Sequence, residues 1–292
     1  MNAITKTVPV ARAAGKKKSR NSELGSYLFL AAILLFLMFP VYWIVVTSLH
    51  TNAELLQLPP KWFPLHPNFA SYLEILKSSV FLTFYKNTLI VASGATIVCI
   101  FVSIFAGYAL SRFKFKGANL LTLLFLSAQM FPTVTLVIGL YSQYQALHLL
   151  NTHYVLILAS TSTSLPFSIM LMRTFFNGIS RELEEAAEID GASRFKTLFT
   201  VIVPLSKPGI MAIAIYTFLI AWDDFLFGLT LVSDIGKRTL SPGLSLTYLG
   251  EYSANWSGAT AAAAAATIPL LIVFMFLQRY MVEGLTAGGV KE

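Results

Sequence analysis

Residues 117–172 read GANLLTLLFLSAQMFPTVTLVIGLYSQYQALHLLNTHYVLILASTSTSLPFSIMLM and contain no Lys, Arg, Asp or Glu. A membrane-spanning helix needs about 20 apolar residues, so this stretch is too long for one span. The polar break QALHLLNTH (145–153) divides it, and we expect spans at about 119–144 and 153–173. Pro132 falls inside the first of these spans and is expected to kink it.

The rest of the chain is also strongly apolar. Of its 292 residues, 56% are hydrophobic and only 12% are charged, whereas a soluble domain has about 25% charged residues. Four more apolar runs predict spans at about 24–49, 87–111, 209–233 and 258–280. The predicted fold class is therefore an all-α integral membrane protein with six transmembrane helices.

Lys and Arg gather in the loops that alternate along this pattern. Most of them lie in the tail 1–22, the loop 112–116, the loop 174–208 and the C-terminal end. The positive-inside rule places these segments, and with them both termini, in the cytoplasm. We expect a disordered basic tail at 1–22 and a single six-span domain at 23–292. Because the positive charge follows the topology, the net charge of +7 does not indicate nucleic-acid binding.

The loop between spans four and five is unusual. Its stretch EEAAEIDGASRFKTLFTVIVPLSKP (184–208) begins within a cluster of acids, although the whole chain has only 14 Asp and Glu. Ser180 can cap a helix over 181–190, and Gly191 can end that helix in a left-handed conformation. A second helix can start at Ser193 and run to about Ile202, where Pro204 and Pro208 limit it.

The result is a helix–Gly–helix elbow over residues 180–203. A solvated loop that balances its own charges is the plain alternative. The paired small residues Ala186 and Ala187, followed by the Gly191 turn, favour a docking surface instead, because small side chains let a partner approach the backbone closely.

These residues resemble a known family. The stretch Glu185-Ala186-Ala187 with Asp190-Gly191-Ala192, followed by Phe199, Ile202, Pro204 and Pro208, resembles the signature loop of binding-protein-dependent ABC importer permeases. The end LTAGGVKE (285–292) and LNTH (150–153) resemble the carbohydrate, maltose-type members. The resemblance implies that the elbow is a coupling loop that docks on a cytoplasmic ATPase. The residues it assigns to that contact are Glu185, Ala186, Ala187, Asp190, Gly191, Ala192, Phe199 and Pro204.

The same resemblance implies the partners and the location. It predicts a bacterial inner-membrane permease that works by alternating access with a second homologous permease, two ATPase subunits, an external solute-binding protein and a sugar substrate. ATP and Mg would be bound by the ATPase, and this chain has no Walker motif. Its four histidines show no metal-ligand spacing, so we expect neither an enzyme nor a metal site. Candidates for contact with the binding protein lie in the outer loop 234–257; they are Ser241, Pro242, Gly243, Tyr248 and Tyr252.

Two adjacent acids interrupt the fifth span. Asp223 lies about 21 Å along a helix from Gly209, well inside the bilayer. In Trp222-Asp223-Asp224-Phe225, an acid stands where permeases of this type often have Asn, which leaves the role of Asp223 open. The candidates for the translocation pathway are Asn87, Gln129, Tyr141, Trp222, Asp223 and Asp224.

Two alternatives remain. One is an ABC importer permease for a non-sugar solute. The other is an ion-coupled secondary transporter that uses Asp223 and Asp224, which the small number of spans and the lack of an evident inverted repeat disfavour.

Overall fold

The computed structural model describes residues 20–250 and 253–289, with side chains at 24–249 and 255–276. Helices dominate the described chain, and the predicted all-α class is confirmed. One short antiparallel pair accompanies them, β1 (Leu249–Gly250) with β2 (Ser253–Ala254). The chain forms two compact units, Met1–Val45 and Val46–Glu292, and the packing described below lies within the second.

Four described helices are long and apolar enough to cross a membrane. They are α1 (Arg20–Ser48), α4 (Ser79–Arg112), α7 (His153–Asn177) and α14 (Trp256–Gly289). α4 begins well ahead of the predicted start at residue 87, because Ser78 caps it by accepting a hydrogen bond from the Phe81 N–H (3.3 Å). Two bent helix pairs raise the count to six if each pair is one span.

The predicted span 119–144 is not a single helix. It consists of α5 (Ala118–Ala128) and α6 (Thr133–Ala146), which meet at an angle of 105°. α5 ends at Ala128, four residues before Pro132, and Pro132 itself has an extended backbone (ψ 131°), so the helix is interrupted between the two elements. The sequence predicted a proline kink. The residue before a proline is pushed out of the helical region, which allows a full break.

The predicted span 209–233 is also broken. α11 (Lys207–Asp223) ends at the first aspartate, and α12 (Leu226–Leu231) follows after a turn. The Asp224 carboxylate accepts hydrogen bonds from the N–H groups of Phe227 (3.2 Å) and Gly228 (2.9 Å) and so caps α12. The second aspartate therefore belongs to a helix start and not to a helix interior.

The remaining elements are short. They are α2 (Asn52–Leu55), α3 (Ala70–Lys77), α8 (Glu182–Ile189), α9 (Arg194–Thr197), a π-helix η1 (Leu198–Ile202), α10 (Val203–Leu205), a 3-10 turn η2 (Ile235–Lys237) and α13 (Leu240–Tyr248). The run Arg194–Leu205 and α11 are bent by 77° relative to each other.

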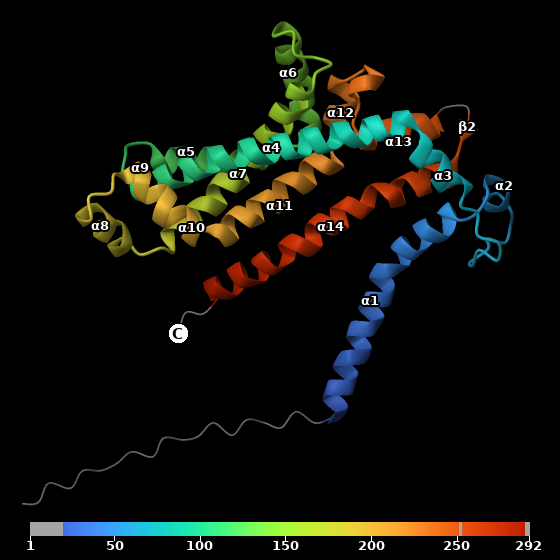
Figure 1. Cartoon of the computed structure of the whole chain (residues 1–292), viewed down its shortest axis with the longest axis horizontal. Coiled ribbons are helices and arrows are strands. Elements are labelled where there is room, and N and C mark those ends of the chain that lie inside the picture. The colour runs from blue at the N-terminus through green and yellow to red at the C-terminus, as the bar shows by residue number, and fades with distance from the viewer. Residues whose placement is uncertain (1–19, 251–252, 290–292) are drawn as a thin grey trace, which may run out of the picture. The chain divides into compact units, whose positions relative to one another are not determined.

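The core is built where α4, α7 and α11 pack along one another (Figure 1). Small residues permit the close approach. A Cβ on Gly107 of α4 would lie 2.7 Å from the Met172 Cβ of α7, and a Cβ on Gly209 of α11 would lie 2.5 Å from the Phe175 ring. α8 and α9 lie at one end of these three helices, so the packed spans hold the elbow in place.

Candidate functional site

The elbow consists of two helical arms joined at a glycine. The first arm is α8, which ends at Ile189. Asp190 caps it, and Gly191 follows with φ of +81°, the left-handed conformation predicted for it. Ser193 begins the second arm by accepting a hydrogen bond from the Lys196 N–H (3.3 Å).

The second arm runs through α9, η1 and α10 to Leu205, beyond the predicted end at Ile202. Pro204, which has no N–H to donate, follows directly after the π turn, in which the Val203 N–H bonds to the Leu198 carbonyl. The proline is therefore accommodated, and the chain bends only after Leu205.

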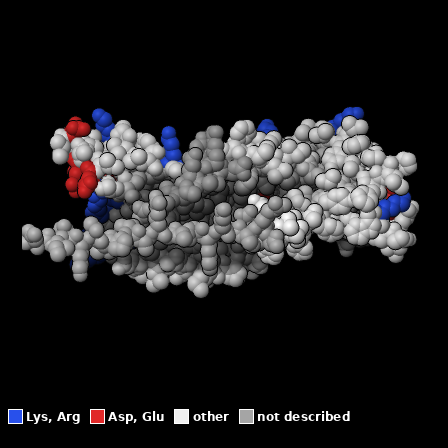
Figure 2. Space-filling view, turned by 90° about the horizontal axis from the view of Figure 1, so that it is seen from below, with Lys and Arg blue, Asp and Glu red and all other residues white. Residues whose placement is uncertain are grey.

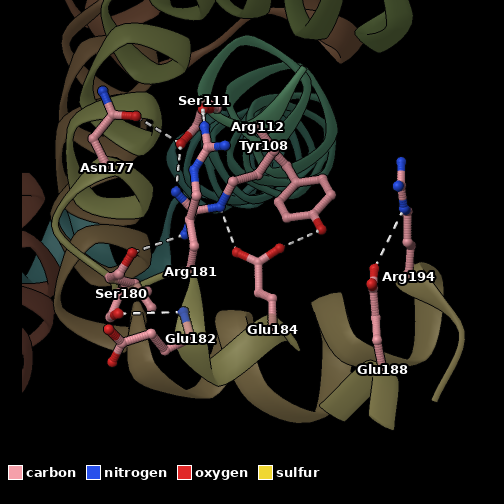
Figure 3. Close-up of polar contacts among 11 residues, drawn as sticks. Tyr108, Ser111, Arg112, Asn177, Ser180, Arg181, Glu182, Glu184, Glu188 and Arg194 are labelled. Atoms are coloured by element: carbon pink, nitrogen blue, oxygen red, sulfur yellow. Dashed lines mark hydrogen bonds and ion pairs between the residues drawn. The ribbon is translucent and has the colours of Figure 1, made fainter. Parts of the chain in front are cut away.

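A polar network ties α8 to the end of α4 (Figure 3). Glu184 accepts hydrogen bonds from the Tyr108 hydroxyl (2.9 Å) and from Nε of Arg112. The Arg112 guanidinium also donates to the Ile179 carbonyl (3.0 Å) and to the Ser111 hydroxyl (3.1 Å). Both oxygens of one carboxylate and three nitrogens of one guanidinium are thus engaged, which fixes the position of α8 on α4.

Burial separates this ion pair from its neighbour. The side chains of Arg112 and Glu184 are 8% and 14% exposed, whereas Arg194 and Glu188, whose charged atoms are 3.5 Å apart, are 67% and 50% exposed. Sequence reasoning did not separate Glu184 from the other acids at the start of the first helix. The acids of the cluster look alike in sequence, and only the packing of α8 against α4 distinguishes this one.

The network also reaches α7. The Ser111 hydroxyl donates to the Asn177 side-chain carbonyl (2.7 Å), which joins the end of α4 to the end of α7. Arg181, at the start of α8, donates to the Ser111 backbone carbonyl (3.5 Å). α8 is therefore attached where two long helices meet.

The opposite side of the elbow faces outward and carries apolar groups. Ile189 is 86% exposed and Leu183 is 46% exposed, and Phe195 of the second arm is 66% exposed. Of the predicted contact residues, Glu185, Ala186, Asp190, Gly191 and Pro204 are exposed, and Ala187 and Ala192 are half-buried. Figure 2 shows acidic side chains gathered at this end of the molecule.

Phe199 is placed differently from the other predicted contact residues. Its ring packs against those of Phe105 of α4 (5.9 Å between ring centroids) and Phe195 (4.9 Å), although it remains 40% exposed. Its packing joins the second arm to α4 and adds to the polar attachment of the first arm.

A cavity of about 770 Å³ opens between α5, α6, α7, α11 and α12. Gln129, in the break between α5 and α6, lines it, as does Asp224 at the start of α12. Tyr141 and Asp223 are exposed and lie outside its lining. The structure therefore brings together two of the six predicted pathway residues.

Two other pathway candidates have structural roles. Asn87 is buried, and its amide donates to the carbonyls of Gly236 (3.0 Å) and Arg238 (2.9 Å), which fastens η2 to α4. Trp222 is buried as well and stacks on Phe218, with ring centroids 5.4 Å apart. Neither residue lines the cavity, and a polar or aromatic residue in a span can equally satisfy its own fold, so a pathway role for Asn87 and Trp222 stays a prediction.

The predicted outer loop is largely folded. Pro242 and Gly243 of α13 are buried, and a Cβ on Gly243 would lie 2.5 Å from the Phe84 ring. Ser241 and Tyr248 are half-buried, and Tyr252 lies outside the described residues. The surface that α13 exposes consists instead of Leu246 and Thr247, which sequence reasoning did not single out.

Comparison with known proteins gives consistent matches. Residues 99–286 match the family model described as "Binding-protein-dependent transport system inner membrane component". The sulfoquinovosyl glycerol transport system permease of Agrobacterium fabrum is 40% identical over 90% of this chain and 93% of its own length. The trehalose/maltose transport system permease of Thermococcus litoralis is 34% identical over 90% and 96%.

A solved structure has the same fold. A chain of a bacterial ABC transporter that imports the acidic polysaccharide alginate aligns with a TM-score of 0.77 and 22% identity. The alignment covers 94% of this chain and 99% of that chain.

Proposed function

Since the chain belongs to the family of binding-protein-dependent transport system inner membrane components, we propose that it is the permease subunit of an ATP-driven sugar importer. The names of its relatives support a carbohydrate substrate, because they include permeases for sulfoquinovosyl glycerol and for trehalose and maltose. The chain would work in the inner membrane with a second permease, two ATPase subunits and an external binding protein. Nucleotide and Mg would be bound by the ATPase.

The observation that carries the proposal is the two-sided elbow. Its inner side is fixed to α4 and α7 through Glu184, Arg112 and Ser111, and its outer side exposes Leu183 and Ile189. A partner that binds the outer side and moves would therefore pull on two long helices at once. This is the mechanical connection that an ATPase needs to switch a permease between outward-open and inward-open states.

The packing supports six crossings. The end of α4 and the end of α7 meet at the Ser111–Asn177 hydrogen bond, so the two helices run in the same direction. The bent pair α5 and α6 must return between them and counts as one span. Together with the positive-inside rule, this arrangement supports the proposal that the elbow and both termini lie in the cytoplasm.

The ion-coupled alternative has less support. A proton-carrying carboxylate must be free to exchange its proton, but each oxygen of Asp224 accepts an N–H of α12. Asp223 is exposed and has no described ion-pair partner.

Transport in reconstituted vesicles tests the proposal. The chain is reconstituted with its second permease, ATPase and binding protein, and uptake of maltose, trehalose and other neutral oligosaccharides is measured. We expect uptake that requires internal ATP and continues in the presence of a protonophore. Uptake that survives removal of the ATPase, or that a protonophore abolishes while ATP remains, would show that the proposal is wrong.

Ile189 provides a test of the elbow itself. Ile189→Asp puts a charge on the outward face and should weaken copurification of the ATPase at least about tenfold, because buried interface cores exclude charge. Ile235→Asp is the matched control, since Ile235 is also exposed (58%) but lies between α12 and α13. Equal ATPase binding by the two variants would show that the elbow is not part of the ATPase interface.

A further inference from the structure

A basic pocket of about 630 Å³ opens where the chain passes from α4 to α5. Its lining comes from the end of α4, the start of α5, the last part of α7 and the residue before α8. None of the described lining residues is Asp or Glu, and four are cations: Lys114, Lys116, Arg173 and Arg181. A pocket lined by charges of one sign concentrates ions of the opposite sign, so this one suits an anion.

The four cations of the basic pocket have no acidic partner in the described part of the chain. The ion pairs formed there involve other cations, and two of these, Arg112 and Arg194, are paired with acids of α8. The positive-inside rule explains basic residues in a solvated loop, and Lys114 and Lys116 are exposed. That rule does not explain why the acids of α8 pair with the neighbouring cations and leave those of the pocket without a counter-charge.

Arg173 differs from the other three cations because it is half-buried. Its Nη1 donates a hydrogen bond to the Thr122 hydroxyl (2.8 Å), whereas its Nε is buried and makes no hydrogen bond with any described residue. A partly desolvated charge without a counter-charge is unfavourable, and a guanidinium matches the oxygens of a phosphate group in geometry. An anion in the pocket is therefore a suitable partner for Arg173.

The start of α5 adds hydrogen-bond donors to the same pocket. Gly117 precedes the helix with φ of +99° and has no side chain to cap it. The N–H groups of Asn119 and Leu120 find no acceptor among the described residues. Unpaired N–H groups at a helix start carry a partial positive charge and favour a phosphate, so they reinforce the four cations.

An apolar stripe leads away from the pocket along α5. Leu123 and Leu126 lie four and seven positions after Asn119 and so share its side of the helix. They are 59% and 48% exposed. A soluble anion would use the pocket alone, whereas a phospholipid also has acyl chains that can cover this stripe. The combination of a cationic pocket and an adjoining apolar stripe therefore favours a lipid.

We propose that the basic pocket binds the phosphate headgroup of an anionic phospholipid, with an acyl chain along Leu123 and Leu126. The lipid would connect the end of α7, through Arg173, to the start of α5. It would belong to the cytoplasmic leaflet, and only this choice of leaflet rests on the proposed function.

Fluorescence quenching by labelled lipids tests the site in the assembled, reconstituted transporter. Cys99, the chain's single cysteine, is buried, and Cys99→Ala provides the background. Leu120→Cys, at an exposed position beside the stripe (60%), carries a bimane fluorophore. The vesicles consist of phosphatidylcholine with a small fraction of phosphatidylglycerol or phosphatidylcholine that has a nitroxide on an acyl chain. The ratio of the two quenching constants measures the preference for the anionic lipid.

We expect phosphatidylglycerol to be preferred by about tenfold, and Lys114→Gln with Lys116→Gln to lower this preference below about threefold. Arg173→Gln alone should lower it as well. Lys86→Gln with Lys237→Gln is the matched control, because these lysines are also exposed but do not line the pocket, and it should keep the full preference. Quenching by neither lipid, no preference, or an equal loss in the pocket and control variants would overturn the proposal.

Inorganic phosphate distinguishes a lipid from a soluble anion. Phosphate added at constant ionic strength should leave the preference unchanged, and a ratio that falls to one would assign the pocket to soluble phosphate and overturn the lipid site. The quenching measurement needs no transport. Sugar uptake without a lipid preference would thus overturn the lipid site alone, whereas a lipid preference without uptake of any sugar would overturn the proposed function alone.

Discussion

At the scale of single residues, two glutamates four positions apart on α8 behave differently. Glu184 is mostly buried and paired with Arg112, whereas Glu188 is half exposed beside Arg194. Exposed pairs contribute up to about 1 kcal/mol, because water screens them and the long side chains lose freedom. Removing one partner of a buried pair leaves an uncompensated charge, which costs about 3–5 kcal/mol.

We therefore expect Glu184→Ala to destabilise the protein by about 3 kcal/mol, because Arg112 is left buried without its counter-charge. Glu188→Ala should change stability by less than about 1 kcal/mol. Thermal unfolding of the purified protein in detergent, followed by tryptophan fluorescence, measures both. Equal unfolding temperatures for the two variants would show that Glu184 does not anchor α8.

At the scale of elements, close helix packing depends on what faces each glycine. Gly94 and Gly107 both lie on α4 toward α7. A Cβ on Gly94 would meet the flexible tip of Ile157 at 2.6 Å, whereas a Cβ on Gly107 would meet the Met172 Cβ at 2.7 Å and a backbone nitrogen at 3.1 Å. A side-chain tip can rotate away, but a Cβ and a backbone move only with their helix.

Gly107→Ala should therefore destabilise the protein by about 1–3 kcal/mol, the usual cost of overpacking. Gly94→Ala should be close to neutral, because alanine is favoured over glycine in a helix by up to about 1 kcal/mol and this offsets a small rotation of Ile157. The unfolding temperatures of the two purified variants in detergent test this difference. A larger loss for Gly94→Ala would contradict the packing of α4 on α7.

At the scale of the whole molecule, tertiary contacts bear on the topology that hydropathy leaves open. A helix pair bent by 105° can be a broken span or a re-entrant loop. The Ser111–Asn177 hydrogen bond joins the ends of α4 and α7, which favours α5 and α6 crossing back between them as one span.

Single cysteines in the Cys99→Ala background check this arrangement. Lys114→Cys and Lys196→Cys should react with a membrane-impermeant thiol reagent from the same side of inverted vesicles, and Lys237→Cys should be protected there. α11 separates Lys196 from Lys237, so their opposite accessibility is the internal control. Opposite accessibility of Lys114 and Lys196 would mean that α5 and α6 form a re-entrant loop.

The sequence alone determined the membrane class, the approximate positions of the spans and the helix–Gly–helix elbow. These features depend on local properties: the length of apolar runs, the placement of Lys and Arg, and the tolerance of Gly191 for a left-handed backbone. Only the tertiary structure shows that Glu184 is the buried acid of the cluster. It also shows that Asn87 and Trp222 pack within the fold, and which residues line the cavity. The physical reason is that Arg112 and Glu184, like Gln129 and Asp224, come together only after packing, and a residue's local sequence does not reveal a partner that lies far along the chain.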